Sequence, residues 1–121
     1  MHVDDDDAIR AITRIALERV GGFELLSCSG GAQALDNIHR FEPQIVLLDV
    51  MMPDMDGPTT LARLRQETDL GKVLVVFMTA KVQEPELARY RALGACDIIF
   101  KPFDPMSLSE RLHAIWTEHH V

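Results

Sequence analysis

The sequence predicts an α/β fold in which helices cover both faces of a parallel β-sheet. Short apolar runs of strand length alternate along the chain with longer stretches whose apolar residues recur at helical spacing. This alternation is typical of sheets built from right-handed β-α-β crossovers. Three apolar runs end on a polar residue, at Asp49, Thr79 and Lys101. Because open α/β sheets bind ligands beyond the carboxyl ends of their strands, these residues predict a functional site at that edge.

Size and composition limit the class of protein. The 121 residues suit one domain, expected to span residues 1–121, and a hydrophobic content of 47% is enough for a core. No apolar stretch approaches the ~18 residues of a membrane span, and the acidic N-terminus is unlike a signal peptide, so we expect a cytoplasmic protein. A net charge of -7 argues against nucleic-acid binding.

Cys28 and Cys96 do not form a metal or redox motif and are expected to be buried thiols.

The first half of the chain predicts three strands and two helices. A short strand at residues 1–4 precedes a helix that the glycines at positions 21 and 22 end. Further strands are expected at residues 23–28 and 44–49, and a second helix starts between them, after Gly31. The first helix is expected to face the core with one apolar stripe, which comprises Ala8, Ile9, Ile12, Ile15, Ala16 and Val20.

The second half predicts two more strands and three more helices, which makes five of each. Pro58 suits the first turn of a helix, and the strand that ends at Thr79 follows that helix. Another helix begins at residues 84–86, where a proline lies between two acids, and the last strand covers residues 96–100. Asp104 is expected to cap the final helix, whose apolar stripe comprises Leu108, Leu112, Ile115 and Trp116.

Three carboxylates are expected to meet at the carboxyl edge of the sheet. Asp4 and Asp5 end the first strand and Asp49 ends the third, and two β-α units between them allow these strands to lie side by side. Carboxylates held close together repel each other, and a divalent cation with oxygen ligands removes that cost. We therefore expect Mg²⁺ or Mn²⁺ there, bound directly by Asp5 and Asp49, with the backbone carbonyl of Met51 as a plausible third ligand.

Two further groups suit phosphoryl chemistry at the same edge. Thr79 would donate to a phosphoryl oxygen, and Lys101 would pair with Asp49 at rest and then neutralise phosphoryl charge. The Lys101-Pro102 bond is a candidate for the cis form, which would direct the lysine inward. Each residue also has an ordinary structural interpretation as a loop cap, a strand-end hydroxyl or a surface lysine. Asp6 and Asp7 fit better as the acidic start of a helix than as part of the site.

Over nearly its whole length the chain resembles the receiver domain of bacterial two-component response regulators, including the single-domain chemotaxis regulators. Each matching segment is weak alone, but together they occur in the right order and at the right spacing. The segments are Val3-Asp4-Asp5-Asp6, Leu47-Leu48-Asp49, Met52-Pro53-Asp54-Met55-Asp56-Gly57, Met78-Thr79-Ala80 and Lys101-Pro102-Phe103.

The resemblance implies a flavodoxin-like sheet of strand order 2-1-3-4-5, here with a shortened first strand. It implies that Asp49 accepts a phosphoryl group from a histidine kinase or histidine phosphotransfer protein. Asp4 and Asp5 match the acidic pair that holds Mg²⁺, Thr79 matches the switch hydroxyl, and Lys101 matches the site lysine.

The sequence also departs from the usual receiver pattern. Ile98 occupies a position where many receivers have a tyrosine or phenylalanine whose ring reports the switch. Because the sequence ends after the last predicted helix, we expect no output domain and an output through a downstream protein target. We expect the protein to be a monomer or a weak homodimer. Met51 offers no hydrogen bond to an attacking water, and with Lys81 it flanks the path of that water, so we expect slow self-dephosphorylation. The expected switch and partner face includes Ile98, Tyr90, Asp97 and Arg111.

Two alternatives accompany the phosphorylatable receiver. A pseudo-receiver would bind proteins without using phosphate, although all five site residues are present here. A phosphatase of the haloacid dehalogenase type also uses an aspartate nucleophile with Mg²⁺, but it needs a second aspartate where this chain has Met51. We therefore expect a signalling protein rather than an enzyme.

Overall fold

The computed structural model describes residues 1–80 and 83–119 and shows a parallel sheet of five strands in the order β2-β1-β3-β4-β5. This confirms the predicted α/β fold and strand order. The strands are β1 (His2–Val3), β2 (Ser27–Cys28), β3 (Ile45–Asp49), β4 (Leu74–Thr79) and β5 (Asp97–Phe100). The helices are α1 (Asp7–Arg14) with its continuation η1 (Ile15–Val20), α2 (Gly31–Phe41), α3 (Gly57–Glu67), α4 (Glu84–Ala92) and α5 (Leu108–His119).

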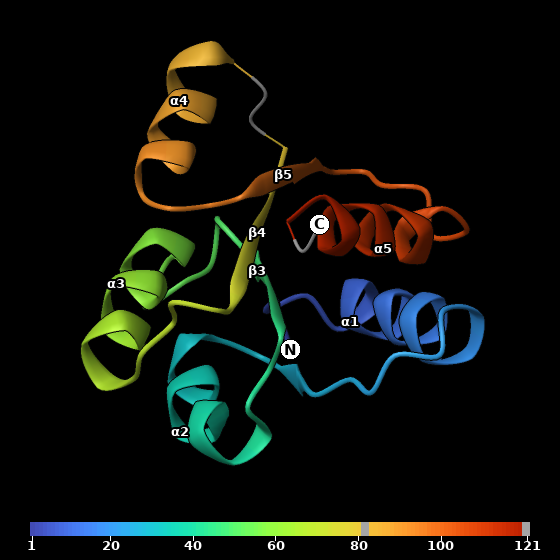
Figure 1. Cartoon of the computed structure of the whole chain (residues 1–121), viewed down its shortest axis with the longest axis horizontal. Coiled ribbons are helices and arrows are strands. Elements are labelled where there is room, and N and C mark those ends of the chain that lie inside the picture. Colours follow the sequence, from blue (N-terminus) through green and yellow to red (C-terminus); the bar gives the residue numbers. More distant parts are fainter. Residues whose placement is uncertain (81–82, 120–121) are drawn as a thin grey trace.

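The helices form a layer on each side of the sheet, with α1 and α5 on one side and α2, α3 and α4 on the other (Figure 1). Alternation of side chains along β3 and β4 gives each layer its own core. Val46, Leu48 and Phe77 face the α2–α4 side, whereas Leu47 and Val76 face the α1–α5 side. Both faces of the central strands are therefore buried, as expected for a parallel sheet. Across the described residues, no helix is long and apolar enough to cross a membrane.

The first two strands are the shortest of the sheet. His2 and Val3 of β1 pair with Ser27 and Cys28 on one side and with Leu47 and Leu48 on the other. The predicted short first strand is thus confirmed. The expected strand at residues 23–28 is wrong in length, because β2 is an edge strand whose partner begins only at His2.

The first helix presents only part of the predicted stripe to the core. Ile12, Ile15 and Val20 are 43%, 53% and 50% exposed, whereas the buried residues are Thr13, Ala16 and Leu17. The helix is rotated so that Arg10 donates to the backbone carbonyl of Asp4 at 2.6 Å. Residues 10, 13 and 17 follow helical spacing, so fixing Arg10 toward the sheet turns Thr13 and Leu17 inward with it.

The last helix keeps its predicted face but begins later than expected. Leu108, Leu112 and Ile115 are buried, and Trp116 is partly buried. Asp104 does not cap this helix, because its carboxylate accepts from the amide of Met106 at 2.9 Å and closes a separate turn before Leu108.

Candidate functional site

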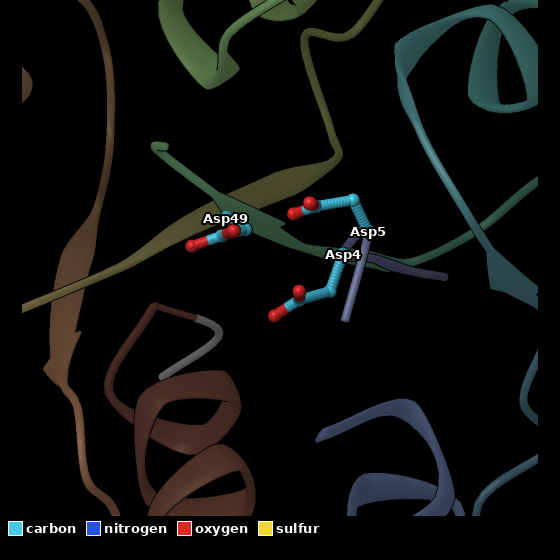
Figure 2. A group of neighbouring side chains, drawn as sticks. All are labelled: Asp4, Asp5 and Asp49. Atoms are coloured by element: carbon cyan, nitrogen blue, oxygen red, sulfur yellow. The ribbon is translucent and has the colours of Figure 1, made fainter. Parts of the chain in front are cut away.

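The three predicted carboxylates do converge at the carboxyl edge of the sheet (Figure 2). Asp4 follows Val3, which is in register with Leu48, so Asp4 lies beside Asp49 at the ends of adjacent strands. One oxygen from each of Asp4, Asp5 and Asp49 lies within 4.8 Å of the others. Asp4 and Asp49 are 0% and 3% exposed, whereas Asp5 is exposed. The cluster is therefore open to solvent on the Asp5 side.

Lys101 lies between two of these carboxylates. Its Nζ is 2.8 Å from Asp4 Oδ2 and 2.9 Å from Asp49 Oδ1. The expected pairing of Lys101 with Asp49 is present, and the pairing with Asp4 is additional. Burial disfavours the charge on Lys101, but its hydrogen bonds to Asp4 and Asp49 outweigh this effect and raise the pKa of the lysine. Lys101 is therefore a firmly charged group at the site.

The electrostatics of the site fit a divalent cation. Burial raises the pKa of Asp49, the hydrogen bond from Lys101 opposes this, and the nearby charge of Asp4 raises the pKa again. Among the described residues, Asp4 and Asp49 of this three-carboxylate cluster form ion pairs with one ammonium, that of Lys101, so the carboxylates outnumber the cation that pairs with them. Clustered carboxylate oxygens, two of them buried, are the hard ligands that Mg²⁺ prefers. The residues present thus fit this ion.

Backbone pairing brings Thr79 to the same edge. Thr79 ends β4 in register with Phe100, and the amide of Lys101 donates to the Thr79 carbonyl at 2.9 Å. The side chains of Thr79 and Lys101 therefore extend from adjacent strand ends, and Thr79 is 1% exposed. The Lys101-Pro102 peptide bond is cis, as the sequence suggested.

The loop after Asp49 folds back closely onto the end of β3. The amide of Gly57 donates to the carbonyl of Val50 at 2.9 Å, and a Cβ at Gly57 would lie 2.5 Å from the Asp49 carbonyl oxygen. Only glycine allows this approach. Asp56 then caps α3 by accepting from the amide of Thr59 at 2.8 Å. Met51 is 62% exposed beside the site, and Lys81 lies outside the described residues.

The acidic run at the start of α1 divides as predicted. Asp6 is the N-cap of α1, and its carboxylate accepts from the amides of Ala8 and Ile9. Asp7 lies in the first turn and pairs with Arg10. Both residues therefore serve the helix start, and only Asp4 and Asp5 join the carboxylate cluster.

His2 also lies beside this cluster, a position that was not predicted from the sequence. The side chain is fully buried, and its Nε2 is 3.9 Å from Asp4 Oδ2. Within the described part of the chain neither ring nitrogen has a hydrogen-bond partner. Burial lowers the pKa of His2 to about 4, although the charge of Asp4 partly opposes this. The signal was available, because residues two apart in a strand point to the same face.

Two residues of the expected switch and partner face are buried in this structure. Tyr90 and Ile98 are 2% and 3% exposed, so neither offers contact area to a partner. The Tyr90 ring packs edge-to-face on Phe77 in the core, with ring centroids 5.4 Å apart. Asp97 and Arg111 do lie toward the surface, where they form an ion pair at 3.3 Å.

Comparisons with known proteins agree on one family. The family described as "Response regulator receiver domain" matches residues 1–113. The transcriptional regulatory protein CseB of Streptomyces coelicolor is 36% identical over 115 residues, which cover 95% of this chain and 47% of that protein. The alkaline phosphatase synthesis transcriptional regulatory protein PhoP of Bacillus subtilis is 34% identical over 113 residues, with coverages of 93% and 46%. The chain thus spans less than half the length of these relatives.

Solved structures give the same fold. The chemotaxis protein CheY4 of Vibrio cholerae superposes with a TM-score of 0.87 at 24% identity, covering 94% of both chains. A CheY-like receiver domain protein of Methanospirillum hungatei gives a TM-score of 0.77 at 26% identity, covering 97% of this chain and 95% of the other. The likeness to CheY4 concerns the fold alone.

Proposed function

The chain belongs to the response regulator receiver domain family, and on that basis we propose that it accepts a phosphoryl group on Asp49 from a histidine kinase or histidine phosphotransfer protein. A receiver is a signalling module of two-component systems rather than an enzyme, and it implies a cognate histidine kinase. The observation that carries the proposal is the position of Asp49, whose Oδ1 is held at 2.9 Å by Lys101 beside two further carboxylates.

The proposed reaction transfers a phosphoryl group between two side chains. An oxygen of Asp49 bonds to phosphorus while the phosphorus–nitrogen bond of the donor phosphohistidine breaks, and the electron pair of that bond remains on the histidine nitrogen. Lys101 and the hydroxyl of Thr79 would stabilise the negative phosphoryl oxygens. Asp5, Asp49 and the Met51 carbonyl would bind Mg²⁺ directly, with Asp4 as the other member of the acidic pair, and the ion would supply further charge neutralisation when it is bound.

The output is proposed to be a change in a protein-binding surface. Lys101 follows β5 directly, so a movement of Lys101 toward a phosphoryl group would act on the strand that carries Asp97. Arg111 connects this strand to α5, because it pairs with Asp97 and donates to the Ile98 carbonyl at 3.2 Å. Phe100 and Met106 are 46% and 70% exposed nearby and offer apolar contact area to a downstream protein.

Loss of the phosphoryl group by hydrolysis is proposed to be slow. Met51 lies two residues after Asp49, and its side chain is 62% exposed at the mouth of the site. A thioether is a weak acceptor and no donor, so it does not orient a water molecule for attack on phosphorus.

The test is the intact mass of the protein after incubation with acetyl phosphate, with and without Mg²⁺. We expect a gain of one phosphoryl group that requires Mg²⁺, is absent in Asp49→Asn and decays slowly once the donor is removed. Asp36→Asn is the matched control, because Asp36 is an exposed residue of α2 outside the site. Failure of the folded wild-type protein to gain mass under all conditions would favour a pseudo-receiver instead.

A further inference from the structure

We propose that His2 is a positioning residue that replaces Lys101 as the hydrogen-bond donor to Asp4 when Lys101 turns toward a phosphoryl group. The inference rests on the proposed phosphorylation of Asp49. His2 lies in β1, the second strand of the sheet, two residues before Asp4 of the carboxylate cluster, and has no role in the transfer itself.

The resting contacts of Asp4 define the need for such a donor. Asp4 Oδ1 accepts from the amide of Asp6 at 2.9 Å, and Oδ2 accepts from Lys101 at 2.8 Å. Lys101 is shared with Asp49, where the new negative charge would form. When a phosphoryl group draws Lys101 away, Asp4 Oδ2 loses its lysine donor while its side chain remains 1% exposed. A Mg²⁺ ion bound directly by Asp5 and Asp49 would leave this oxygen without a direct ligand. A buried carboxylate oxygen without a donor is strongly unfavourable.

His2 is placed to fill that position. Its Nε2 is 3.9 Å from Asp4 Oδ2, beyond hydrogen-bond length, so a movement of about 1 Å closes the contact. The ring is buried and both of its nitrogens are unpaired among the residues that the structure describes, so no existing hydrogen bond opposes this movement. A neutral imidazole carries one N–H, and the tautomer with hydrogen on Nε2 is the required donor.

A spectroscopic experiment tests the exchange of donors without phosphoryl chemistry. In Lys101→Met, Asp4 Oδ2 has lost its lysine, so we expect His2 to adopt the Nε2–H tautomer with a hydrogen-bonded, slowly exchanging proton. Nitrogen-15 labelling of histidine makes this proton visible by NMR. His39 and His113 are exposed and provide internal controls whose ring protons exchange rapidly with water. Absence of the protected Nε2–H in Lys101→Met would overturn the inference.

Binding of beryllofluoride, a mimic of the phosphoryl group, tests the functional consequence in the intact protein with Mg²⁺ present. His2→Leu is expected to bind it about tenfold more weakly than wild type, the size of a lost hydrogen bond to a carboxylate. His2→Gln should restore near wild-type affinity, because its amide nitrogen is a donor at a similar reach. Equal affinities of the Leu and Gln variants would also overturn the inference.

Urea unfolding separates this role from a merely structural one. His2→Leu removes two buried unpaired nitrogens, so its stability should be equal to or greater than that of wild type while its beryllofluoride affinity falls. A loss of stability that accompanies the loss of affinity would indicate a structural role and contradict the proposal. If the wild-type protein binds no beryllofluoride, the proposed phosphorylation fails, whereas the Lys101→Met spectrum still decides whether His2 can take the place of the lysine.

Discussion

Strands β1 and β3 deliver carboxylates to the same edge of the sheet by different means. β3 is five residues long and pairs with β4 along its full length, so Asp49 is placed by a continuous buried ladder. β1 is two residues long, and Asp4 has one backbone bond to β2, from its amide to the Cys28 carbonyl at 3.0 Å, with its other contacts lying beyond the strand. These contacts come from Lys101, Arg10 and the amide of Asp6. One half of the site therefore depends on strand pairing and the other half on individual hydrogen bonds.

The largest expected difference between the two strands is the loss of stability when a buried valine is shortened in each. Val46 of β3 and Val3 of β1 are both 0% exposed and both face the α2–α4 side of the sheet, so Val→Ala makes the same chemical change at each. We expect Val46→Ala to cost about 3 kcal/mol and Val3→Ala about 1.5 kcal/mol, because a short strand can shift to close the cavity. Urea denaturation measures both values. Equal losses would mean that β1 is held as rigidly as β3.

Much of this comparison could be predicted from the sequence. The apolar run before Asp49 has the length of a buried strand, and only two residues separate Met1 from the acidic pair, so a long β3 and a short β1 were both expected. The convergence of Asp4, Asp5 and Asp49 follows from parallel strand order alone. The end of a buried strand is marked in the sequence by the change from apolar to polar residues, so the polar residues of the site could be predicted without tertiary contacts.

Features that depend on tertiary contacts were not predictable in the same way. The apolar pattern of α1 favoured a core-facing stripe with Ile12 and Ile15, but the contact of Arg10 with the Asp4 carbonyl selects another face. Tyr90 was assigned to the surface, although α4 turns it into the core against Phe77. The spacing of apolar residues predicts that a segment is helical. It does not predict which side of the helix tertiary contacts will turn toward the core.

For a protein chain that begins at Met1, an effect of medium size on stability is expected from the buried start of β1. The Met1 ammonium donates to the Ile45 carbonyl at 2.9 Å, and burial lowers its pKa from 8.0 to about 6, with a small opposing effect of Cys28. As the pH falls below 8, the unfolded chain takes up this proton before the folded chain does. Stability should therefore decrease between pH 8 and pH 6, by on the order of 2 kcal/mol, and this contribution is fully lost below about pH 6.

Acetylation of the Met1 amine isolates this effect from other titrating groups. Urea denaturation of the free and acetylated chains from pH 8.5 to pH 5.5 should give a steeper pH dependence for the free chain. Parallel curves for the two forms would show that the ammonium stays hydrated, and β1 would then begin in solvent rather than inside the sheet.

The smallest expected effect concerns the tether between α1 and the end of β1. Arg10 donates to the Asp4 carbonyl at 2.6 Å, and its side chain is 20% exposed, so this hydrogen bond is partly shielded from water. Arg10→Met should cost about 1 kcal/mol in urea denaturation, because it removes the shielded hydrogen bond to the Asp4 carbonyl, together with an ion pair to the exposed Asp7, while keeping the apolar stem. Arg14→Met is the matched control on the same helix, since the Arg14 side chain is 51% exposed and pairs with Glu18.

The same pair of variants tests whether Asp4 depends on individual contacts for its position. If it does, Arg10→Met should bind Mg²⁺ about threefold more weakly by calorimetry, because Asp4 loses a restraint on its backbone while Asp49 keeps its strand. Arg14→Met should change the affinity little, as exposed ion pairs contribute only about 0–1 kcal/mol and this one touches neither carboxylate. Equal Mg²⁺ affinities in both variants would show that two residues of strand pairing are enough to hold Asp4, and the contrast between β1 and β3 would then be one of stability alone.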